Sequence, residues 1–235
     1  MYDDAARFYD VIHKARGRNP GAEADLVIAE ARRLAPHAAT LLDVGCGTGA
    51  HLPRFSQVFD VVGVDLSPHM LAIASRQAPN VPLVEGDFRS FELDRTFDVA
   101  VSLFSGIGYL VERADLEAAV AHIADHLNTG GALLIEGWVE PDYWIDGAVN
   151  ADSGRDGDLA VARAVRSSRQ GMRCEIEMRY AAATPEGIST VDEQHTMRIS
   201  DPNEFAEAFA AAGLSFERLP HMLHGGRSVY AGVKA

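Results

Sequence analysis

Three glycines follow a short apolar run in the stretch LLDVGCGTGA, residues 41–50. Gly45, Gly47 and Gly49 allow the chain to turn sharply and let a ligand approach the main chain closely. A strand, such a loop and then a helix favour a nucleotide-like ligand at the N-terminus of the helix. The spacing fits neither the G-x-G-x-x-G of dinucleotide sites nor a P-loop, which would end in Gly-Lys-Ser/Thr. The alternative is a tight structural turn that binds nothing.

Two carboxylates stand at the ends of the next two expected strands. Asp65 ends VVGVD, where a carboxylate can accept both hydroxyls of a ribose. Asp87 and Phe88, in EGDFRSF, are placed to bond an adenine amino group and flank its ring. The fourth strand ends in SLFS, residues 102–105. Because ligands of open α/β sheets bind at the carboxyl ends of the strands, these residues predict a nucleoside ligand without a second phosphate.

The elements that must hold these residues alternate between strand and helix. Apolar spacing and turn residues predict an α/β fold, a parallel sheet with helices on both faces. We expect strands at 40–44, 61–65, 81–84, 97–105 and 131–138, and helices at 21–35, from the glycine loop to about 57, from Ser67-Pro68, and at 113–127.

The rhythm breaks after Trp138. Strands expected at 158–167, 172–183 and 188–200 follow one another without helices, which predicts an antiparallel β unit inserted at about 145–200. A helix at 203–212 then restores the α/β pattern, and strands near 214–219 and 228–234 predict an antiparallel hairpin at the sheet edge, through the HGG turn.

Composition excludes several kinds of partner and site. A net charge of −13 leaves no basic excess for a nucleic-acid backbone. There is no run of about 18 apolar residues and no signal peptide, so we expect no membrane segment. Cys46 and Cys174 lie too far apart to suggest a disulfide framework or zinc site, which favours a reducing cytoplasm. His122 and His126 have metal-ligand spacing but lack a third ligand, so we expect a solvated helix face and no metal.

Three linked motifs, DVGCGTG, VD-L-S-x-x-M and GD-F, resemble the class I S-adenosylmethionine-dependent methyltransferases over roughly residues 36–136 and 203–235. The resemblance implies a Rossmann-like, mostly parallel seven-stranded sheet with an antiparallel last strand. It also implies S-adenosylmethionine as the cofactor. The cofactor residues that it implies are Tyr9, Asp43, Gly45, Cys46, Gly47, Gly49, Asp65, Leu66, Met70, Asp87, Phe88 and Leu103.

The resemblance gives these residues distinct roles. The glycine loop would face the methionine part of the cofactor, and Asp43 would hold the loop or a water near the cofactor amino group. Asp65 would take the ribose, while Tyr9 would close over the cofactor. Leu66 and Met70 would wall the adenine that Asp87 and Phe88 fix. For Leu66, Met70 and Phe88 the alternative is an ordinary place in the core.

A narrower resemblance covers nearly the whole chain. The segments FYDVIHKARGR, FSGIGYL, SSRQG and GGRSVYAGV resemble the N,N-dimethyltransferases that act on nucleotide-linked amino sugars in macrolide antibiotic biosynthesis. This implies a TDP-linked amino deoxysugar as acceptor and a homodimer, with the insert walling the substrate site and helping to pair the subunits. Asn19-Pro20-Gly21 and Gly137-Trp138-Val139 depart from the relatives' Asp-Tyr and Pro-Trp-Trp, which leaves the sugar itself undetermined.

Methyl transfer asks mainly for alignment of a neutral amine, so we expect no catalytic triad. By the family match, Tyr109 would lie beside the sugar amine and orient it, with Tyr2 as a second catalytic candidate. The alternatives are a loop tyrosine and a frayed terminus. We expect Trp138 and three arginines to contact the substrate, since the arginine fork suits phosphate. These arginines are Arg227, Arg166 and Arg169, and the alternative for each is a solvated surface position.

Glu193 and His195 lie on one side of an expected insert strand and have no assigned role. Two other functions stay open. One is a small-molecule methyltransferase with a different amine or a phenol as acceptor. The other is a cofactor-binding protein without transferase activity.

Overall fold

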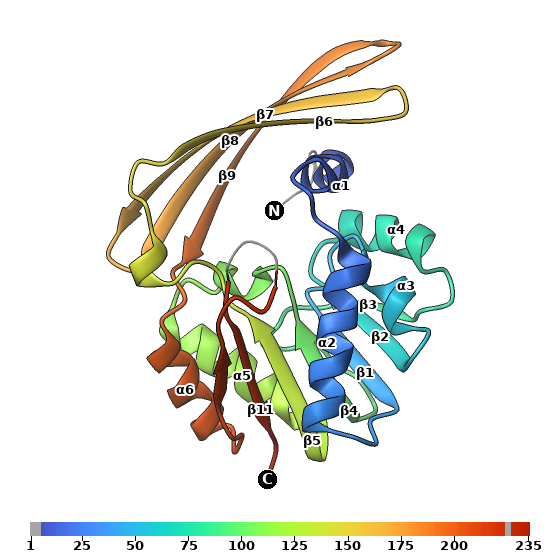
Figure 1. Ribbon diagram of the computed structural model, residues 1–235, viewed down its shortest axis with the longest axis vertical. Helices are drawn as coiled ribbons and strands as arrows, with labels where there is room; N and C mark the ends of the chain where they lie inside the picture. Colours follow the sequence, from blue (N-terminus) through green and yellow to red (C-terminus); the bar gives the residue numbers. More distant parts are fainter. Residues whose placement is uncertain (1–5, 224–226) are drawn as a thin grey trace.

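The computed structural model describes residues 6–223 and 227–235, which form two sheets joined by helices (Figure 1). The larger sheet has seven strands in the order β10-β11-β5-β4-β1-β2-β3. Its strands are β1 (Thr40–Val44), β2 (Asp60–Asp65), β3 (Leu83–Glu85), β4 (Phe97–Ser102), β5 (Leu127–Glu136), β10 (Glu217–Leu219) and β11 (Val229–Val233).

The pairing confirms the predicted topology. β1 to β5 are parallel, β11 runs antiparallel to β5, and β10 pairs antiparallel with β11. Strand order reverses at β1, which lies between β2 and β4. The loops that leave β1 and β4 therefore flank the crevice where open α/β sheets bind their ligands.

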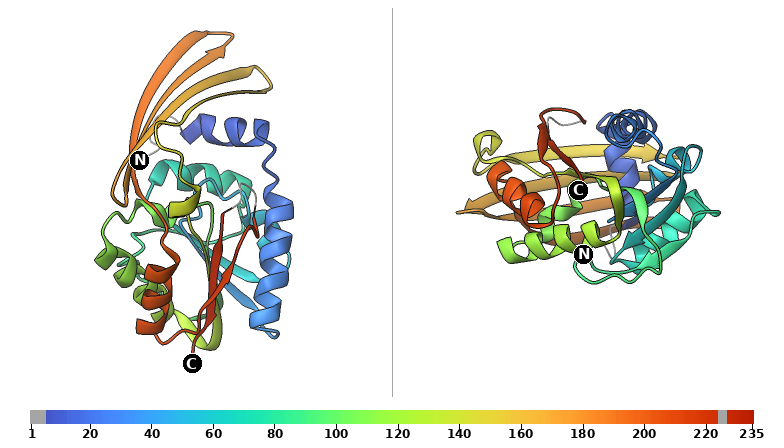
Figure 2. Two further views of the ribbon diagram at one scale, coloured as in Figure 1. Left: turned by 60° about the vertical axis from the view of Figure 1, so that its left-hand side comes forward. Right: turned by 90° about the horizontal axis from the view of Figure 1, so that it is seen from below.

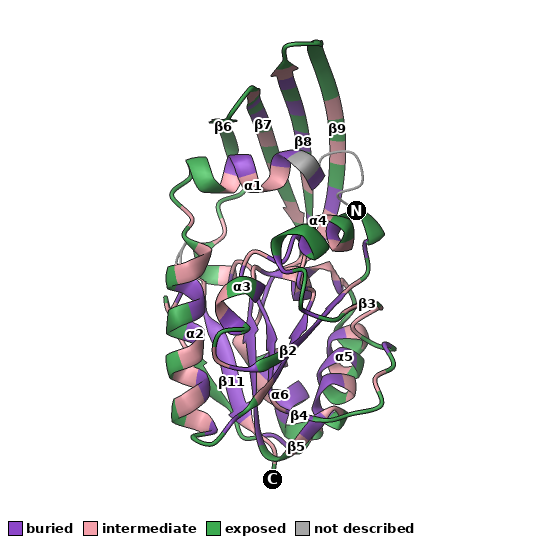
Figure 3. Ribbon diagram, turned by 90° about the vertical axis from the view of Figure 1, so that its right-hand side faces the viewer, coloured by how far each residue is buried: buried purple, intermediate pink, exposed green. Residues whose placement is uncertain are grey.

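Helices cover both faces of this sheet, as predicted. On one face lie α2 (Pro20–Leu34), α3 (Leu52–Phe55) and α4 (Pro68–Gln77); on the other lie α5 (Arg113–Asp125) and α6 (Pro202–Ala211). Alternate residues of each central strand enter the two cores, so Leu41 and Leu42 of β1 are both fully buried but on opposite faces. Figure 3 shows this buried interior in purple.

Local capping fixes where two of these helices begin. Asn19 accepts a hydrogen bond from the Ala22 amide at 3.1 Å and Pro20 follows it, so α2 starts where the cap permits. Ser67 caps α4 in the same way, accepting from the Met70 amide at 3.3 Å ahead of Pro68. The Ser67-Pro68 start was predicted from sequence, and it places the preceding Asp65 at the mouth of the crevice.

The insert is a four-stranded antiparallel sheet in the order β6-β7-β8-β9, called sheet B below. Its strands are β6 (Val149–Asp156), β7 (Leu159–Gln170), β8 (Arg173–Thr184) and β9 (Gly187–Arg198). The sequence predicted three of them and missed β6. The sequence of β6, VNADSGRD, contains mostly Asn, Asp, Ser and Gly, which are poor strand formers, and only its pairing with β7 makes it a strand.

Helix α1 (Ala6–Ala15) lies between sheet B and the carboxyl edge of the seven-stranded sheet (Figures 1 and 2). Phe8 and Ile12 are buried against Val161, Met178 and Tyr180 on the inner face of sheet B. The sequence reading did not assign a helix here. Two short 3-10 helices, η1 (Gly106–Tyr109) and η2 (Pro141–Tyr143), complete the rim of the same space.

Candidate active site

A cavity of about 540 Å³ lies between the carboxyl edge of the seven-stranded sheet, α1 and the inner face of sheet B. That volume suits a drug-sized ligand or a nucleoside with part of a second ligand. The predicted site residues that line it are Tyr9, Asp43, Gly45, Cys46, Gly47, Asp65, Leu66, Met70, Asp87, Phe88, Leu103, Tyr109, Trp138 and Arg227. Tyr2 lies outside the described residues.

The glycine loop is held against β2 by its own main chain. The amides of Gly45 and Cys46 both donate to the Val64 carbonyl, at 2.7 and 2.9 Å. Gly45 has φ +76, and a Cβ there would stand 2.7 Å from the Phe88 ring. Gly47 has φ +57 and open space around its missing side chain. Any side chain at Gly45 or Gly47 would therefore strain the loop, and at Gly45 it would collide with a cavity wall.

Gly49, predicted as a cofactor residue, packs against α4. It does not line the cavity, and a Cβ at Gly49 would stand 2.9 Å from the Cβ of Ala74. This glycine therefore lets α4 pack closely on the loop instead of facing a ligand.

Asp65 ties the glycine loop to the start of α4. One of its carboxylate oxygens accepts from the Gly47 amide at 2.7 Å, and the other accepts from the Ser67 amide at 2.8 Å. Burial raises the pKa of Asp65, while these two amides act in the opposite direction. The assignment of Asp65 to the ribose stays a prediction, and the structure adds that this carboxylate also shapes the loop.

Asp43 is a buried carboxylate with an unused acceptor. It is 1% exposed, lines the cavity, and its Oδ2 has no hydrogen-bond partner among the described residues. Burial, helped by the neighbouring Asp65 carboxylate, raises the pKa of Asp43 to about 7. A buried acceptor without a donor is costly, so this oxygen is suited to a ligand that brings a cationic donor.

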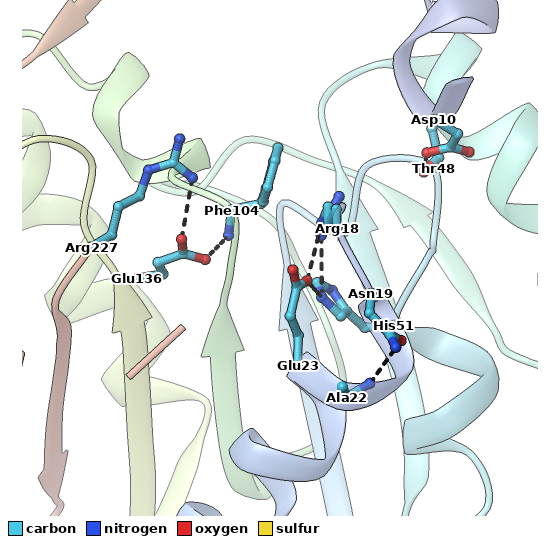
Figure 4. Close-up of polar contacts among 10 residues, drawn as sticks. All are labelled: Asp10, Arg18, Asn19, Ala22, Glu23, Thr48, His51, Phe104, Glu136 and Arg227. Carbon is cyan, nitrogen blue, oxygen red and sulfur yellow. Dashed lines mark hydrogen bonds and ion pairs between the residues drawn. The ribbon is translucent and has the colours of Figure 1, made fainter. Parts of the chain in front are cut away.

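Arg18 is a cavity residue that the sequence reading missed. Its side chain, 6% exposed, stacks 3.6 Å above the Phe104 ring, and its Nε donates to Glu23 at 3.0 Å. Its Nη2 lies 3.2 Å from His51 Nε2, which in turn lies 2.9 Å from Glu23 (Figure 4). A rigid buried cation beside the glycine loop suits a carboxylate. Nothing in the spacing of Arg18 distinguished it from the other arginines of KARGR.

The four residues predicted to contact the adenine lie in different surroundings. The Phe88 ring covers both Gly45 and Gly106, so it does form a wall of the cavity. Asp87 is instead held by Arg89, whose Nε and Nη2 each donate at 2.8 Å, and this lowers the pKa of Asp87. Met70 is 4% exposed, as a core residue would be, although it lines the cavity, whereas Leu66 is 48% exposed.

The loop after β4 carries backbone strain at the cavity. Phe104 and Ser105 have φ of 56 and 64, a region that costs non-glycine residues on the order of 1–3 kcal/mol each. Glu136 holds this loop by accepting from the Phe104 amide at 2.5 Å, and Ser105 Oγ donates to the Gly137 carbonyl at 2.8 Å. Such strain is typical of functional sites, and no residue type in SLFS predicts it.

Helix α1 is hydrogen-bonded across the glycine loop. Asp10 accepts from Thr48 at 2.9 Å (Figure 4). It also accepts from Gln77 of α4 at 2.8 Å. These bonds hold Tyr9 and His13 over the cavity, where their rings contact Phe104.

Four arginines converge near His13. Burial, followed by the charges of Arg163, Arg18, Arg16 and Arg227, lowers the pKa of His13 to about 2, so the imidazole is neutral. These arginines put positive charge on the His13 side of the cavity, although the lining as a whole contains equal numbers of arginines and aspartates, in a protein of formal net charge −13. Arginine forks are suited to the oxygens of phosphate groups.

The three predicted substrate arginines lie in different places. Arg227 lines the cavity and pairs with Glu136 at 3.3 Å. Arg166 lies on the outer face of sheet B and pairs with Glu177 at 2.6 Å, and Arg169 donates to the Gly171 carbonyl at the strand end. Neither of these two lines the cavity, so the geometry gives them no support, and both assignments stay predictions.

Arg163 of the same strand does line the cavity, and it faces the side opposite to Arg166 because residues three apart on a strand point to opposite faces. It is 7% exposed and pairs with Asp152 at 2.6 Å, while its Nε has no partner among the described residues. The pairing register that decides which of these arginines faces inward is not visible in the sequence.

The acceptor side of the cavity combines aromatic rings with a buried polar chain. The rings of Trp138 and Trp144 meet edge to face with centroids 5.6 Å apart. Tyr109 Oη lies 2.9 Å from His195 Nδ1, and His195 Nε2 lies 3.1 Å from Glu193. The sequence reading gave no role to this histidine and glutamate.

The described residues 6–223 and 227–235 contain no cluster that could hold a metal. The prediction that His122 and His126 form a solvated helix face is wrong. Both rings pack against Phe91, whose carbonyl lies 2.7 Å from His122 Nε2. None of the helices in that same part of the chain has the length and apolar character needed to span a bilayer.

Known proteins similar to this chain in sequence include methyltransferases. A family model described as "Methyltransferase domain" matches residues 41–131. The dTDP-3-amino-3,4,6-trideoxy-alpha-D-glucopyranose N,N-dimethyltransferase of Streptomyces venezuelae is 39% identical over 238 residues, covering 100% of both chains. The chain belongs to this family of N,N-dimethyltransferases.

Solved structures agree over the full length. The crystal structure of DesVI from Streptomyces venezuelae matches with a TM-score of 0.94 at 38% identity, over 99% of each chain. The S-adenosylmethionine-bound amino pentose methyltransferase from Micromonospora echinaspora matches with a TM-score of 0.87 at 36% identity, over 100% of this chain and 98% of that one. This N-methyltransferase uses S-adenosylmethionine as its cofactor.

The cavity residues fit that cofactor. The free Asp43 oxygen is suited to its ammonium group and Arg18 to its carboxylate, while Gly47 leaves room at the loop main chain. When bound, S-adenosylmethionine supplies an electrophilic methyl group. The chain's own residues then have to hold and orient an amine, exclude water, and remove a proton.

Proposed function

We propose that the acceptor is the amino group of a TDP-linked amino deoxysugar and that the enzyme adds two methyl groups to its nitrogen. The observation that carries this proposal is the division of one cavity into two halves. One half is the glycine loop with Asp43, Asp65 and Phe88, and the other is walled by sheet B, Trp138 and the arginines. A cofactor alone would not need the second half. The named activity of the Streptomyces venezuelae relative supports this acceptor class.

The convergent arginines support a diphosphate. Arg227 and Arg163 line the cavity from the segment before β11 and from sheet B, and within residues 6–223 and 227–235 each pairs with one carboxylate. Two guanidinium groups held in this way can accept the charge of a nucleoside diphosphate without a metal ion. The phosphates would then anchor the substrate so that its sugar lies toward Tyr109.

The reaction needs little from the protein beyond this placement. A neutral amine nitrogen attacks the methyl group in line, and an N–C bond forms as the S–C bond breaks. Good alignment alone can lower such a barrier by roughly 7–11 kcal/mol. Tyr109 lies on the cavity wall and is placed to orient the nitrogen lone pair.

Turnover with defined acceptors tests the proposal. Purified protein with S-adenosylmethionine and a thymidine-diphospho 3-amino deoxysugar should give two successive additions of a methyl group on nitrogen by mass spectrometry. Methylation of a glycine-type amine or a phenol, with no product from the sugar nucleotide, would establish the first alternative. Cofactor binding by calorimetry without any turnover would establish the second.

We further propose that two copies pair through the outer face of sheet B. Ala160 and Ala162 of β7 lie directly opposite Ala183 and Ala181 of β8, and Ile188 beside them is 81% exposed. This patch of small apolar groups is bordered by the ion pairs Arg166–Glu177 and Arg179–Asp192, which a second copy can complement.

Light scattering should give twice the chain mass, and Ala162→Asp should give monomers with unchanged circular dichroism. A monomeric wild type would refute the pairing.

The cellular place follows from chemistry. Both cysteines are free and buried, and S-adenosylmethionine and nucleotide sugars are metabolites of the cell interior, so we propose that the enzyme works in the cytoplasm.

A further inference from the structure

A hydrogen-bonded chain of three side chains leads from the acceptor side of the cavity into sheet B. Tyr109 Oη lies 2.9 Å from His195 Nδ1, and His195 Nε2 lies 3.1 Å from Glu193 Oε2. His195 is 3% exposed, whereas the Glu193 side chain keeps 10% of its surface exposed on the edge strand β9. The chain therefore begins at the cavity wall, crosses a buried imidazole and ends near the surface.

Close packing fixes this geometry. Tyr109 ends η1, and a Cβ on the preceding Gly108 would stand 2.8 Å from the Met197 methyl group on β9. Arg198 joins the same two elements, since it donates to the Val111 carbonyl at 3.1 Å and pairs with Glu204 of α6. The tyrosine and the histidine are thus held in register by contacts on both sides.

Dimethylation creates a proton problem that this chain can solve. An amine in neutral solution is largely protonated, and each methyl transfer gives an ammonium product. A protonated nitrogen has no lone pair, so a proton must leave before each of the two transfers. Alignment cannot substitute for this step.

We infer that Tyr109, His195 and Glu193 form a relay that takes the proton from the acceptor ammonium. The N–H proton passes to Tyr109 Oη as the Oη–H proton passes to His195 Nδ1. The amine gains its lone pair and His195 becomes an imidazolium beside the Glu193 carboxylate. The Nε2–H proton then passes through the Glu193 carboxylate to solvent at the edge of β9, which leaves a proton on Nδ1. Before the second transfer, the Nδ1 proton returns through Tyr109 Oη to water in the cavity and Nε2 regains a proton through Glu193, which restores the starting tautomer. The inference rests on the proposed acceptor, and it makes Tyr109 the residue that touches substrate while His195 and Glu193 act through it.

The positions of Glu193 and Tyr109 on either side of the imidazole give the two ring nitrogens of His195 different roles. Glu193 accepts from Nε2–H and so leaves the Nδ1 lone pair to accept from Tyr109. A carboxylate that fixes the tautomer of a histidine and stabilises its protonated form is the arrangement of hydrolase triads. The spacing Glu193-x-His195 on one strand puts both side chains on the same face.

Other groups around His195 are poor proton acceptors. On the inner face of sheet B, Cys174 of β8 has its pKa raised to about 11 by burial, and the Tyr180 hydroxyl donates to Met178. Arg163 of β7 pairs with Asp152, and Arg198 pairs with Glu204. Among the described residues of these strands, His195 is the group whose ring nitrogen faces the Tyr109 hydroxyl.

A double-mutant cycle with Tyr109→Phe and His195→Gln tests the relay. Each single variant should lower kcat about tenfold at pH 7.5, which is less than the 10²–10⁴-fold common for general bases, because some acceptor binds as the neutral amine. The double variant should also lose about tenfold, because both changes interrupt one path. Cofactor affinity and melting temperature should stay close to wild type. Gln194→Ala, a change on the exposed outer face of the same strand, should leave kcat unchanged.

Two further readouts separate a relay from a structural role. The kcat deficit of His195→Gln should shrink at pH values above the pKa of the acceptor amine, because the substrate then arrives deprotonated. Glu193→Gln should show the same recovery. The relay would be overturned if the two single-variant losses in kcat multiplied to about a hundredfold in the double variant. A kcat deficit of His195→Gln that does not change with pH would also overturn it. If wild type methylates only some other amine, the proposed acceptor fails, and the same cycle on that amine still decides the relay.

Discussion

Asp65 shows how one side chain can serve both the fold and the ligand. Its two oxygens already accept from the Gly47 and Ser67 amides, at 2.7 and 2.8 Å, while its position at the end of β2 is one from which a carboxylate can accept ribose hydroxyls. Each carboxylate oxygen has room for a second donor. Loop shape and cofactor affinity are therefore linked through a single residue.

Asp65→Ala should weaken S-adenosylmethionine binding by roughly 1.5–3 kcal/mol, the range for hydrogen bonds to a charged group. Calorimetry measures this directly. Asp60→Ala provides the matched control, because Asp60 starts the same strand and makes a surface pair with Arg95. Unchanged affinity in a folded Asp65 variant would rule out the ribose assignment.

Arg227 is expected to act on the other ligand. Arg227→Ala should raise KM for the sugar nucleotide and leave cofactor affinity nearly unchanged, because the two ligands contact different walls of the cavity. Steady-state kinetics with calorimetry separates the two effects. Arg166→Ala is the control, since Arg166 lies on the outer face of sheet B. Equal loss of both affinities would mean that Arg227 mainly compensates the buried Glu136, and a loss of kcat alone would also contradict the prediction.

Asp43 should make the cofactor-free protein less stable as pH rises. Its pKa is raised from 3.8 to about 7 in the fold, so its contribution to stability is full below about pH 4 and is lost between pH 4 and pH 7. Asp43→Asn should therefore raise the melting temperature of the cofactor-free protein by an amount that grows from pH 4 to pH 7 and then levels off. Thermal unfolding across this range gives the answer. A gain that is independent of pH would show that the fold does not raise the pKa of Asp43.

At the scale of elements, α1 depends on one glycine of sheet B. Gly154 of β6 faces the helix, and a Cβ there would stand 2.7 Å from the Val11 carbonyl and 2.9 Å from the Ala15 methyl group. Gly154→Ala should push α1 away and cost about 1–3 kcal/mol in unfolding free energy, as overpacking does. KM should rise for both ligands, because α1 carries Tyr9 and Asp10. Gly157→Ala, at a turn with open space, should lose stability only through its φ of 56 and should leave both KM values unchanged.

The elements that sequence predicts best are those with a strong local pattern. The apolar runs of β1, β2 and β5 and the Ser67-Pro68 start of α4 were all located within a few residues, because strand burial and capping are local physics. β6 and α1 were not assigned as elements, since each is defined by a partner far away in the chain. β6 becomes a strand through β7, and α1 packs on sheet B through Phe8 and Ile12.

The same reasoning explains which site residues were found. The glycine loop, Asp65 and Phe88 follow strand ends in sequence order, so a reader of the chain can place them. Arg18 and Arg163 reach the cavity, and His195 reaches Tyr109, through register and helix docking, which no short motif encodes. Arg163 and Arg166 are three residues apart on one strand and so face opposite sides of sheet B, and the sequence alone does not say which side faces inward.

At the scale of the whole molecule, the arginines near His13 carry a charge opposite in sign to the net charge of the protein. The chain carries a formal charge of −13, yet His13 lies near four arginines that face or approach the cavity. An anionic sugar nucleotide is therefore repelled at long range and attracted at short range. Salt screens the first interaction more than the second, because surface charges separated by more than about 10 Å are screened at 0.1 M and partly buried pairs much less so.

This balance predicts an unusual dependence on salt. Raising sodium chloride from about 20 to 200 mM should change the wild-type KM for the sugar nucleotide by less than about twofold, because weaker repulsion offsets weaker attraction. Arg227→Ala loses part of the attraction and keeps the repulsion, so its elevated KM should fall as salt is added. Initial rates over a salt series, with the ionic strength of the substrate itself included, measure both slopes. Cofactor KM provides the internal control, since S-adenosylmethionine has no excess of negative charge to repel. A wild-type KM that rises steeply with salt would show that the arginines dominate at all distances, and the net charge would then have no part in substrate capture.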